Sequence, residues 1–263
     1  ENCAYELLME LQQKYGRDIP VTVLIGSIRD KKRLDEVFET YHPTVVFHAA
    51  AHKHVPLMEV SPAEAVKNNV LGTKNLLVSA SEHDVERFVQ LSTDKAVNPT
   101  SVMGCTKRIC EMLIQTFAGN TDMKCVAVRF GNVLGSHGSV IPLFEAQIKK
   151  GGPVTLTDPN IERYFMTIPE AAQLVLQAGA LAESGNIYVL DMGEPVEKLY
   201  EELMMDEEQD KMRRTQHNKI FVASPRSIDL AEFYEQLQEL AKAAQHNDEG
   251  VVRQLAAMIP TFT

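Results

Sequence analysis

The most informative residues of this chain are a carboxylic acid and an amine that stand side by side in the tetrapeptide Ser92-Thr93-Asp94-Lys95. The tetrapeptide follows an apolar stretch, 86–91, that predicts a β-strand. At a strand end, one group of such a pair can take a carbon-bound proton while the other protonates a leaving hydroxyl. This chemistry is elimination of water beside a carbonyl. An isolated Asp-Lys pair is more often a strand cap beside a solvated lysine, so its surroundings must decide.

A second lysine, Lys107, lies four residues after Met103 in a segment that predicts a helix, 101–118. This spacing places the two side chains one turn apart on the same helix face. Lys107 could cover the helix surface or reach the same site as Lys95. A free lysine has a pKa of about 10.4, so Lys95 needs burial or a neighbouring cation to act as a base near neutral pH. Met103 has no titratable proton, and we therefore expect it to pack.

Short apolar segments alternate with amphipathic helices over the first half of the chain. That alternation predicts an α/β protein with a Rossmann-like, doubly wound parallel sheet that is covered on both faces. The pattern loosens after Gly131. The predicted strands are 20–26, 44–50, 88–91, 124–130, a β-like 154–157 and 186–191, and the predicted helices are 1–15, 30–41, 62–83, 101–118, 141–149, 169–182 and 230–246.

Composition limits the partners that this chain can have. The 263 residues carry a formal net charge of −10, which argues against nucleic acid or an anionic membrane surface as a partner. No apolar run approaches the roughly 20 residues that span a bilayer. Four cysteines without a C-x-x-C pair indicate neither a zinc site nor a disulfide framework, and they favour a reducing cytoplasm. His52 and His54, without a nearby acid, also predict no metal site.

The stretch 47–59, FHAAAHKHVPLME, resembles the extended short-chain dehydrogenase/reductase enzymes. It is most similar to their CapD-like polysaccharide-biosynthesis branch, which contains UDP-N-acetylhexosamine 4,6-dehydratases. Four further blocks carry the resemblance in family order over about residues 1–205, namely 68–73, 92–107, 129–136 and 163–171. The resemblance implies a Rossmann-like fold, NAD as the cofactor, a UDP-sugar as the substrate and a homo-oligomer.

By this resemblance, four residues carry the reaction. Asp94 protonates the departing C6 hydroxyl, and Lys95 removes the C5 proton. Thr93 hydrogen-bonds the 4-hydroxyl region of the sugar, while Lys107 holds the nicotinamide ribose and lowers the barrier to hydride transfer electrostatically. Because Met103 stands where most of the superfamily has tyrosine, the 4-hydroxyl proton leaves through Asp94, Thr93 or the ribose, and the sequence does not say which.

The resemblance also assigns residues to the two ligands. Small side chains at 49–51 allow NAD to approach closely, and Lys53 contacts a phosphate of the cofactor or the substrate. Asn69 braces the site helix beside the cofactor through backbone hydrogen bonds. The Arg163 guanidinium suits a diphosphate because of its planar fork of donors, with a surface role as the alternative. The cofactor residues are Ser27, Ile28, Ala49, Ala50, Ala51, Lys53, Asn69 and Lys107, and the substrate residues are Lys53, Met103, Asn132, Ser139, Val140 and Arg163.

Two parts of the family pattern are missing from these residues. The chain opens on a helix and lacks the Gly-rich turn that receives a dinucleotide, so the expected NAD-binding domain, 1–135, is without its first βα unit. Residues 136–263 are expected to form mainly the nucleotide-sugar-binding lobe. The junction 196–197 skips a stretch that normally carries a phosphate-binding arginine. We therefore expect a longer protein or one that has lost these loops, which its intact mass would decide.

The sequence thus predicts a NAD-dependent nucleotide-sugar 4,6-dehydratase of surface polysaccharide biosynthesis. Its expected substrate is a UDP-N-acetylhexosamine, with UDP-N-acetylglucosamine (UDP-GlcNAc) favoured. It is expected in the cytoplasm, and methionine in place of tyrosine resembles a membrane-associated subgroup, so the full-length protein could be anchored. Two alternatives stay open. A 4-epimerase would use the same fold, although the Asp94-Lys95 pair argues against it, and the missing Gly-rich turn favours a cofactor-free binding or assembly module.

Overall fold

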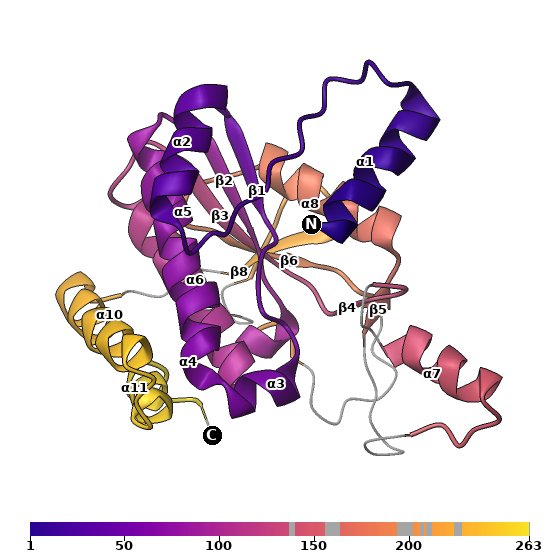
Figure 1. Cartoon of the computed structure of the whole chain (residues 1–263). Coiled ribbons are helices and arrows are strands. Elements are labelled where there is room, and N and C mark those ends of the chain that lie inside the picture. The colour runs from indigo at the N-terminus through magenta and orange to yellow at the C-terminus, as the bar shows by residue number, and fades with distance from the viewer. Residues whose placement is uncertain are drawn as a thin grey trace.

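Four of the predicted strands form a parallel sheet in the computed structural model (Figure 1). The structure describes residues 1–136, 140–155, 164–193, 202–205, 208, 212–223 and 228–262. Across the described sheet the order is β1-β2-β3-β6-β8-β7, which confirms the predicted α/β fold class. The parallel strands are β1 (Val45–His48), β2 (Arg87–Leu91), β3 (Lys124–Arg129) and β6 (Ile187–Leu190), and β8 (Ile220–Ala223) and β7 (Arg213–Arg214) continue the sheet antiparallel.

Helices cover both faces of this sheet. One face carries α2 (Lys31–Tyr41), α5 (Gly72–Glu82) and α6 (Val102–Ala118), and the other carries α8 (Ile168–Ala180) (Figure 1). Successive residues of β2 point to opposite faces of the sheet. Phe88 packs in the apolar cluster that contains Ile109 of α6, whereas Val89 packs in the cluster that contains Leu174 of α8. Burial on both faces explains why the strands are apolar throughout rather than alternating.

The helix predicted over 62–83 is a helical stretch with a wider turn in its middle. It begins as α4 (Pro62–Ala65), passes through the π-helical turn η1 (Val66–Leu71) and continues as α5. Such a turn changes the direction in which backbone and side chains project, and it occurs frequently at functional sites. Asn69, one of the predicted cofactor residues, lies inside this turn.

The segment 20–26 is not the buried strand that its apolar sequence predicts, so that prediction is wrong. Ile25 is 60% exposed, and none of the described strands pairs with the segment. An extended segment becomes a strand only where a neighbour offers a ladder of hydrogen bonds. Strand β1 is also shorter than the predicted 44–50, and it is the edge of the described sheet, with Phe47 45% exposed.

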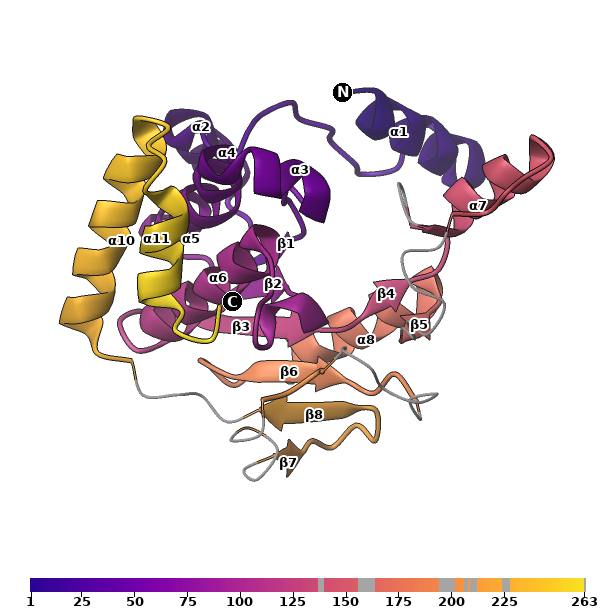
Figure 2. The ribbon, with the colours of Figure 1, turned by 90° about the horizontal axis from the view of Figure 1, so that it is seen from below.

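The predicted helix 1–15 is present as α1 (Asn2–Tyr15), which has no buried residue and projects from the body (Figures 1 and 2).

The second half of the chain adds a small extension and an outer helical layer. Figure 2 shows β4 (Asn132–Val133), β5 (Phe165–Met166) and α7 (Val140–Lys149) extending away from the main sheet. Helices α10 (Leu230–Gln245) and α11 (Val251–Met258) pack outside α4 and α6. Strands β7 and β8 and helix α11 were not predicted, and residues 154–155 are not the β-like segment expected there. Within the described ranges, none of the helices combines the length and apolar composition that a bilayer crossing requires.

Candidate active site

The loop 92–95 leaves the sheet where β2 ends and stays attached to β3. The Ser92 amide donates to the carbonyl of Val128 at 2.7 Å, and the Asp94 amide donates to the carbonyl of Phe130 at 3.2 Å. Thr93 then caps the single 3-10 turn η2 (Asp94–Ala96), since its Oγ1 accepts from the amide of Lys95. The backbone of the predicted catalytic loop is therefore held on both sides of Thr93.

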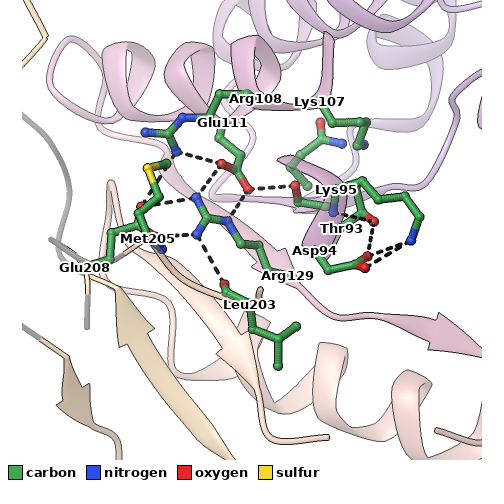
Figure 3. A network of polar contacts seen from close by, with 12 residues as sticks. Thr93, Asp94, Lys95, Lys107, Arg108, Glu111, Arg129, Leu203, Met205 and Glu208 are labelled. Atoms are coloured by element: carbon green, nitrogen blue, oxygen red, sulfur yellow. Dashed lines mark hydrogen bonds and ion pairs between the residues drawn. The ribbon is translucent and has the colours of Figure 1, made fainter. Parts of the chain in front are cut away.

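The side chains of Thr93, Asp94 and Lys95 form one hydrogen-bonded group (Figure 3). Thr93 Oγ1 donates to Asp94 Oδ1 at 2.6 Å, and Lys95 Nζ lies 3.0 Å from Asp94 Oδ2 and 3.2 Å from Oδ1. The Asp94 side chain is 1% exposed, whereas that of Lys95 is 29% exposed. A buried acid thus stands next to an amine that solvent can reach, which is an arrangement that can move protons between two neighbouring substrate atoms.

Helix α6 begins close beside this loop. Ser101 caps its first turn by accepting from the amide of Gly104 at 3.1 Å, and the amide of Val102 donates to Glu59 Oε1 at 2.8 Å. Gly104 faces the backbone of the loop so closely that a Cβ there would collide with the carbonyl oxygen of Lys95. A residue without a side chain is therefore required for α6 to approach the site.

Lys107 lies on α6 behind the end of β2, and it is buried. Its Nζ donates to the carbonyl of Leu91 at 2.6 Å, which is the one acceptor that it contacts among the described residues. Burial lowers the pKa of Lys107, and the nearby Cys110 and Glu111 only partly oppose that effect. Met103, one turn earlier, lies in the apolar core at 4% exposed, so its thioether packs with apolar neighbours.

His48, which ends β1, is a buried polar residue of the site that was not among those predicted from the sequence. Its Nε2 lies 2.9 Å from Thr73 Oγ1, and the ring meets that of Phe88 edge-on. Burial, reinforced by the positive charge of Lys107, lowers the pKa of His48 to about 3. The ring is therefore neutral at physiological pH. The sequence feature that could have indicated His48 is its position as a polar residue at the end of an apolar strand, directly before the alanines of the predicted NAD site.

Asn69 ties the loop after β1 to helix α6. Its Oδ1 accepts from the amide of His52 at 2.7 Å, and its Nδ2 donates to the carbonyl of His52 at 3.0 Å and to Thr106 Oγ1 at 3.0 Å. The loop that these bonds hold contains Ala49 and Ala50, which are exposed. The predicted cofactor residues 49–51 thus sit at the carboxyl end of β1, on the edge where the carboxyl ends of parallel strands meet.

The remaining predicted ligand residues have varied surroundings. Ile28 packs against α5, because a Cβ on Gly72 would lie 2.7 Å from its side chain, and Asn75 Nδ2 donates to its carbonyl at 3.3 Å. Ser27 and Lys53 are exposed. Asn132 pairs with β5 and donates through Nδ2 to the carbonyl of Tyr164 at 3.3 Å. Three parts of the prediction lie outside the described residues, namely Ser139, Arg163 and the junction 196–197, as does the side chain of Val140. Among the described residues, no cluster of His, Cys, Asp or Glu could hold a metal ion.

Solved structures share this fold. A structure titled "X-ray structure of Pen from Bacillus thuringiensis" superposes with a TM-score of 0.75 at 29% identity, covering 89% of this chain and 86% of that one. A dTDP-glucose 4,6-dehydratase from Streptomyces venezuelae, DesIV, solved with NAD and DAU bound, superposes with a TM-score of 0.65 at 21% identity, covering 72% and 63%. The second likeness is one of fold alone.

Sequence comparison gives the family. Residues 1–197 match the family described as "Polysaccharide biosynthesis protein", and the chain belongs to it. It is 59% identical over 197 residues to "Capsular polysaccharide biosynthesis protein CapD" of Staphylococcus aureus, covering 74% of this chain and 33% of that protein. "Probable polysaccharide biosynthesis protein EpsC" of Bacillus subtilis is 56% identical over 196 residues, again covering 74% and 33%. The chain thus spans about a third of the length of these relatives.

Proposed function

We propose that this chain carries the catalytic residues of a NAD-dependent nucleotide-sugar 4,6-dehydratase, with UDP-GlcNAc as its substrate. The observation that carries the proposal is the contact of a buried Asp94 with a partly exposed Lys95, 3.0 Å apart, beside the hydroxyl of Thr93. Removal of water across a C–C bond needs an acid and a base directed at adjacent carbons. An epimerase that acts only at C4 has no use for this pair.

The proton balance of the elimination fits the observed pair. When the elimination begins, Lys95 must be the neutral amine and Asp94 the carboxylic acid, and these two groups lie 3.0 Å apart. Lys95 takes the C5 proton while Asp94 protonates the C6 hydroxyl, so the C5–H and C6–O bonds break, a C5–C6 double bond forms and water leaves. The pair then stands as ammonium and carboxylate. Lys95 afterwards returns a proton to C5, and a hydride from the bound cofactor would complete the reduction at C6.

Thr93 offers a route for the proton of the 4-hydroxyl. Met103 is packed in the core and has no proton to exchange. The Thr93 hydroxyl already donates to Asp94 Oδ1 at 2.6 Å, so a proton entering at Thr93 can pass to the carboxylate. That transfer would supply the proton which Asp94 gives to the leaving hydroxyl. The contact therefore favours Thr93 and Asp94 over the ribose among the routes that the sequence left open.

The described residues fit a nicotinamide cofactor at the edge formed by β1 and β2. Bound NAD supplies reversible hydride exchange with the sugar carbons. Lys107 is a buried ammonium with three donors, of which one reaches Leu91, so its chemistry suits the acceptor oxygens of a ribose. Ala49 and Ala50 are exposed at the strand end and carry only methyl groups, which suits the close approach of a flat ring. We assign residues 1–135 to this cofactor and 136–263 mainly to the UDP-sugar.

The relatives support this proposal. Two proteins that are more than half identical over three quarters of this chain are named for capsular or other polysaccharide biosynthesis, and a fold neighbour is a dTDP-glucose 4,6-dehydratase solved with NAD. A second candidate comes from the same comparisons, since a "UDP-glucose 4-epimerase" of Rickettsia canadensis is 44% identical over 169 residues, covering 63% of this chain and 49% of that protein. A UDP-sugar 4-epimerase is therefore the alternative enzyme.

One experiment separates the candidates. The purified protein is incubated with UDP-GlcNAc in D₂O, and the nucleotide-sugar product is analysed by mass spectrometry and NMR. A dehydratase yields a product that has lost one water and carries solvent deuterium at C5. A product with the mass of the substrate and inverted C4 would establish the epimerase instead. Absence of both products, together with absence of NAD in the denatured protein, would favour a binding module.

A further inference from the structure

A cluster of four charged side chains is buried beside the candidate active site (Figure 3). Arg129, which ends β3, donates to both oxygens of Glu111, with Nε to Oε1 and Nη2 to Oε2 each at 2.7 Å. The same guanidinium donates to Glu208, with Nη1 to Oε2 at 2.6 Å and Nη2 to Oε1 at 3.2 Å. Arg108 Nη1 adds a bond to Glu111 Oε2 at 2.9 Å. Two cations thus face two carboxylates, and none of the four side chains is more than 6% exposed.

The charged forms of these side chains are stabilised by their ion pairs with one another rather than by hydration. Burial by itself would raise the pKa of Glu111, but the charge and hydrogen bonds of Arg129, with Arg108, outweigh burial and lower that pKa to about 2. Glu111 and Glu208 in turn raise the pKa of Arg129 against the effect of burial. A guanidinium that meets two carboxylates through paired bonds fixes both in its own plane. The cluster therefore sets the geometry of the elements that carry it.

Ser92 connects the cluster to the predicted catalytic loop. Its Oγ donates to Glu111 Oε1 at 2.7 Å, and it directly precedes Thr93. Glu111 also lies one turn after Lys107 on α6, and Lys107 in turn donates to the carbonyl of Leu91, the residue before Ser92. A rotation of the Glu111 carboxylate would consequently break or bend its hydrogen bond to Ser92 and so shift the loop relative to α6.

Glu208 comes from a part of the chain beyond residue 197, where the family match ends. Locally, its Oε2 accepts from the amide of Met205 at 3.1 Å, and the carbonyl of Leu203 accepts from Arg129 Nη1 at 3.4 Å. The backbone carbonyl of Leu203 and the side chain of Glu208 thus both contact Arg129. Without Glu208, the two arginines would face one carboxylate in a space that water does not reach.

We propose that Glu208 is a positioning residue for the reaction, which acts through Arg129, Glu111 and Ser92 to hold the Thr93–Lys95 loop against helix α6. This inference rests on the proposed function, because the loop is assigned there as the acid and base. Among the described residues, the Glu208 carboxylate contacts Arg129, Arg108 and the amide of Met205, so its effect on the loop is one of orientation. It links the C-terminal part of the chain to the chemistry at the end of β2.

The test uses Glu208→Gln and Ser92→Ala, with Glu239→Gln as the matched control on an exposed pair of α10. We expect Glu208→Gln to lower kcat by about a hundredfold, the cost of a small misplacement of catalytic groups, with KM little changed. Ser92→Ala, which leaves all four charges in place, should lower kcat by roughly fivefold to tenfold, the value of one hydrogen bond. Hydrogen exchange at the amides of Ser92 and Asp94 should be faster in both variants and unchanged in the control.

Hydrogen exchange keeps this test separate from the test of function. If the wild-type protein turns over no nucleotide sugar, the proposed function fails, while exchange at the loop amides still reports whether Glu208 orders the loop. If Glu208→Gln does not fold, Ser92→Ala decides. Wild-type kcat in Ser92→Ala, or loop exchange in Glu208→Gln equal to that of Glu239→Gln, would overturn the proposal.

Discussion

Gly104 of helix α6 lies against the carbonyl oxygen of Lys95, at a separation that leaves no room for a Cβ atom. The neighbouring Pro99 closes the same space, 3.2 Å from the position that a Cβ would take. This contact brings the start of α6 against the loop that carries Asp94 and Lys95. Because the obstructing atom belongs to the backbone, it cannot turn aside as a flexible side chain could.

Gly104→Ala should therefore displace the loop and reduce turnover. We expect the free energy of unfolding to fall by about 1–3 kcal/mol, as for other overpacked sites. Turnover should fall by about a hundredfold if Lys95 moves. Denaturant unfolding and steady-state kinetics measure the two effects. The control is Gly119→Ala, where the nearest atom to an added Cβ is 3.9 Å away, and equal behaviour of the two variants would refute the steric argument.

Lys95→Ala should stop solvent deuterium from entering the product at C5, because the variant has no amine to remove the C5 proton. Binding of the nucleotide sugar should remain, since Asp94 and the backbone of the loop are untouched. NMR of the product formed in D₂O checks the first point and calorimetry checks the second. Lys242→Ala removes an exposed lysine and should behave as wild type. A Lys95→Ala variant with wild-type turnover would exclude Lys95 as the base.

Met103→Leu should keep most activity and stability, because the swap conserves volume in a packed core and costs under about 1.5 kcal/mol. Met103→Ala should lower the free energy of unfolding by about 2–5 kcal/mol through the cavity that it leaves. Urea unfolding with parallel activity measurements tests the pair. A loss of several orders of magnitude in turnover for Met103→Leu would show a direct role for the thioether.

Lys107→Met should reduce the amount of NAD that co-purifies with the protein, because the buried ammonium is replaced by a side chain of similar length without donors. The pKa of His48 should rise in the same variant, since the Lys107 charge helps to lower it. NAD released by acid and the His48 ring signals in NMR give independent readouts. Lys124→Met, at the exposed start of β3, is the control. Unchanged NAD content would remove Lys107 from the cofactor site.

His48 should make the protein less stable in mild acid. Its pKa is about 3 in the folded protein and about 6.5 when unfolded, so between these values only the unfolded state binds the proton. Stability is then lost as the pH falls below about 6.5, by up to about 1.4 kcal/mol per pH unit. His48→Gln should flatten this dependence between pH 6.5 and 5, above the range where most carboxylates titrate. Chemical unfolding over that range measures it, and His54→Gln, an exposed histidine, should leave the slope unchanged.

The sequence alone was sufficient for what depends on local pattern. The alternation of apolar segments with amphipathic helices predicted the parallel sheet, and the boundaries of α2 and α6 fall within a residue of those expected. The order Thr93-Asp94-Lys95 after an apolar run predicted an acid and a base at a strand end, and the four-residue spacing placed Met103 and Lys107 on one helix face. The spacing of apolar residues that marks a helix or a strand involves only residues close together in the sequence, so it can be recognised without the tertiary structure.

Tertiary structure decided whatever depends on residues far apart in the chain. The apolar segment 20–26 did not become a strand, because strand formation needs a hydrogen-bonding neighbour that its own sequence cannot supply. Burial of His48 follows from the approach of Thr73 and Lys107, and Arg129 meets Glu208 across 79 positions. Desolvation and ion pairing are sums over all atoms within a few ångströms, and only the folded chain determines which atoms those are.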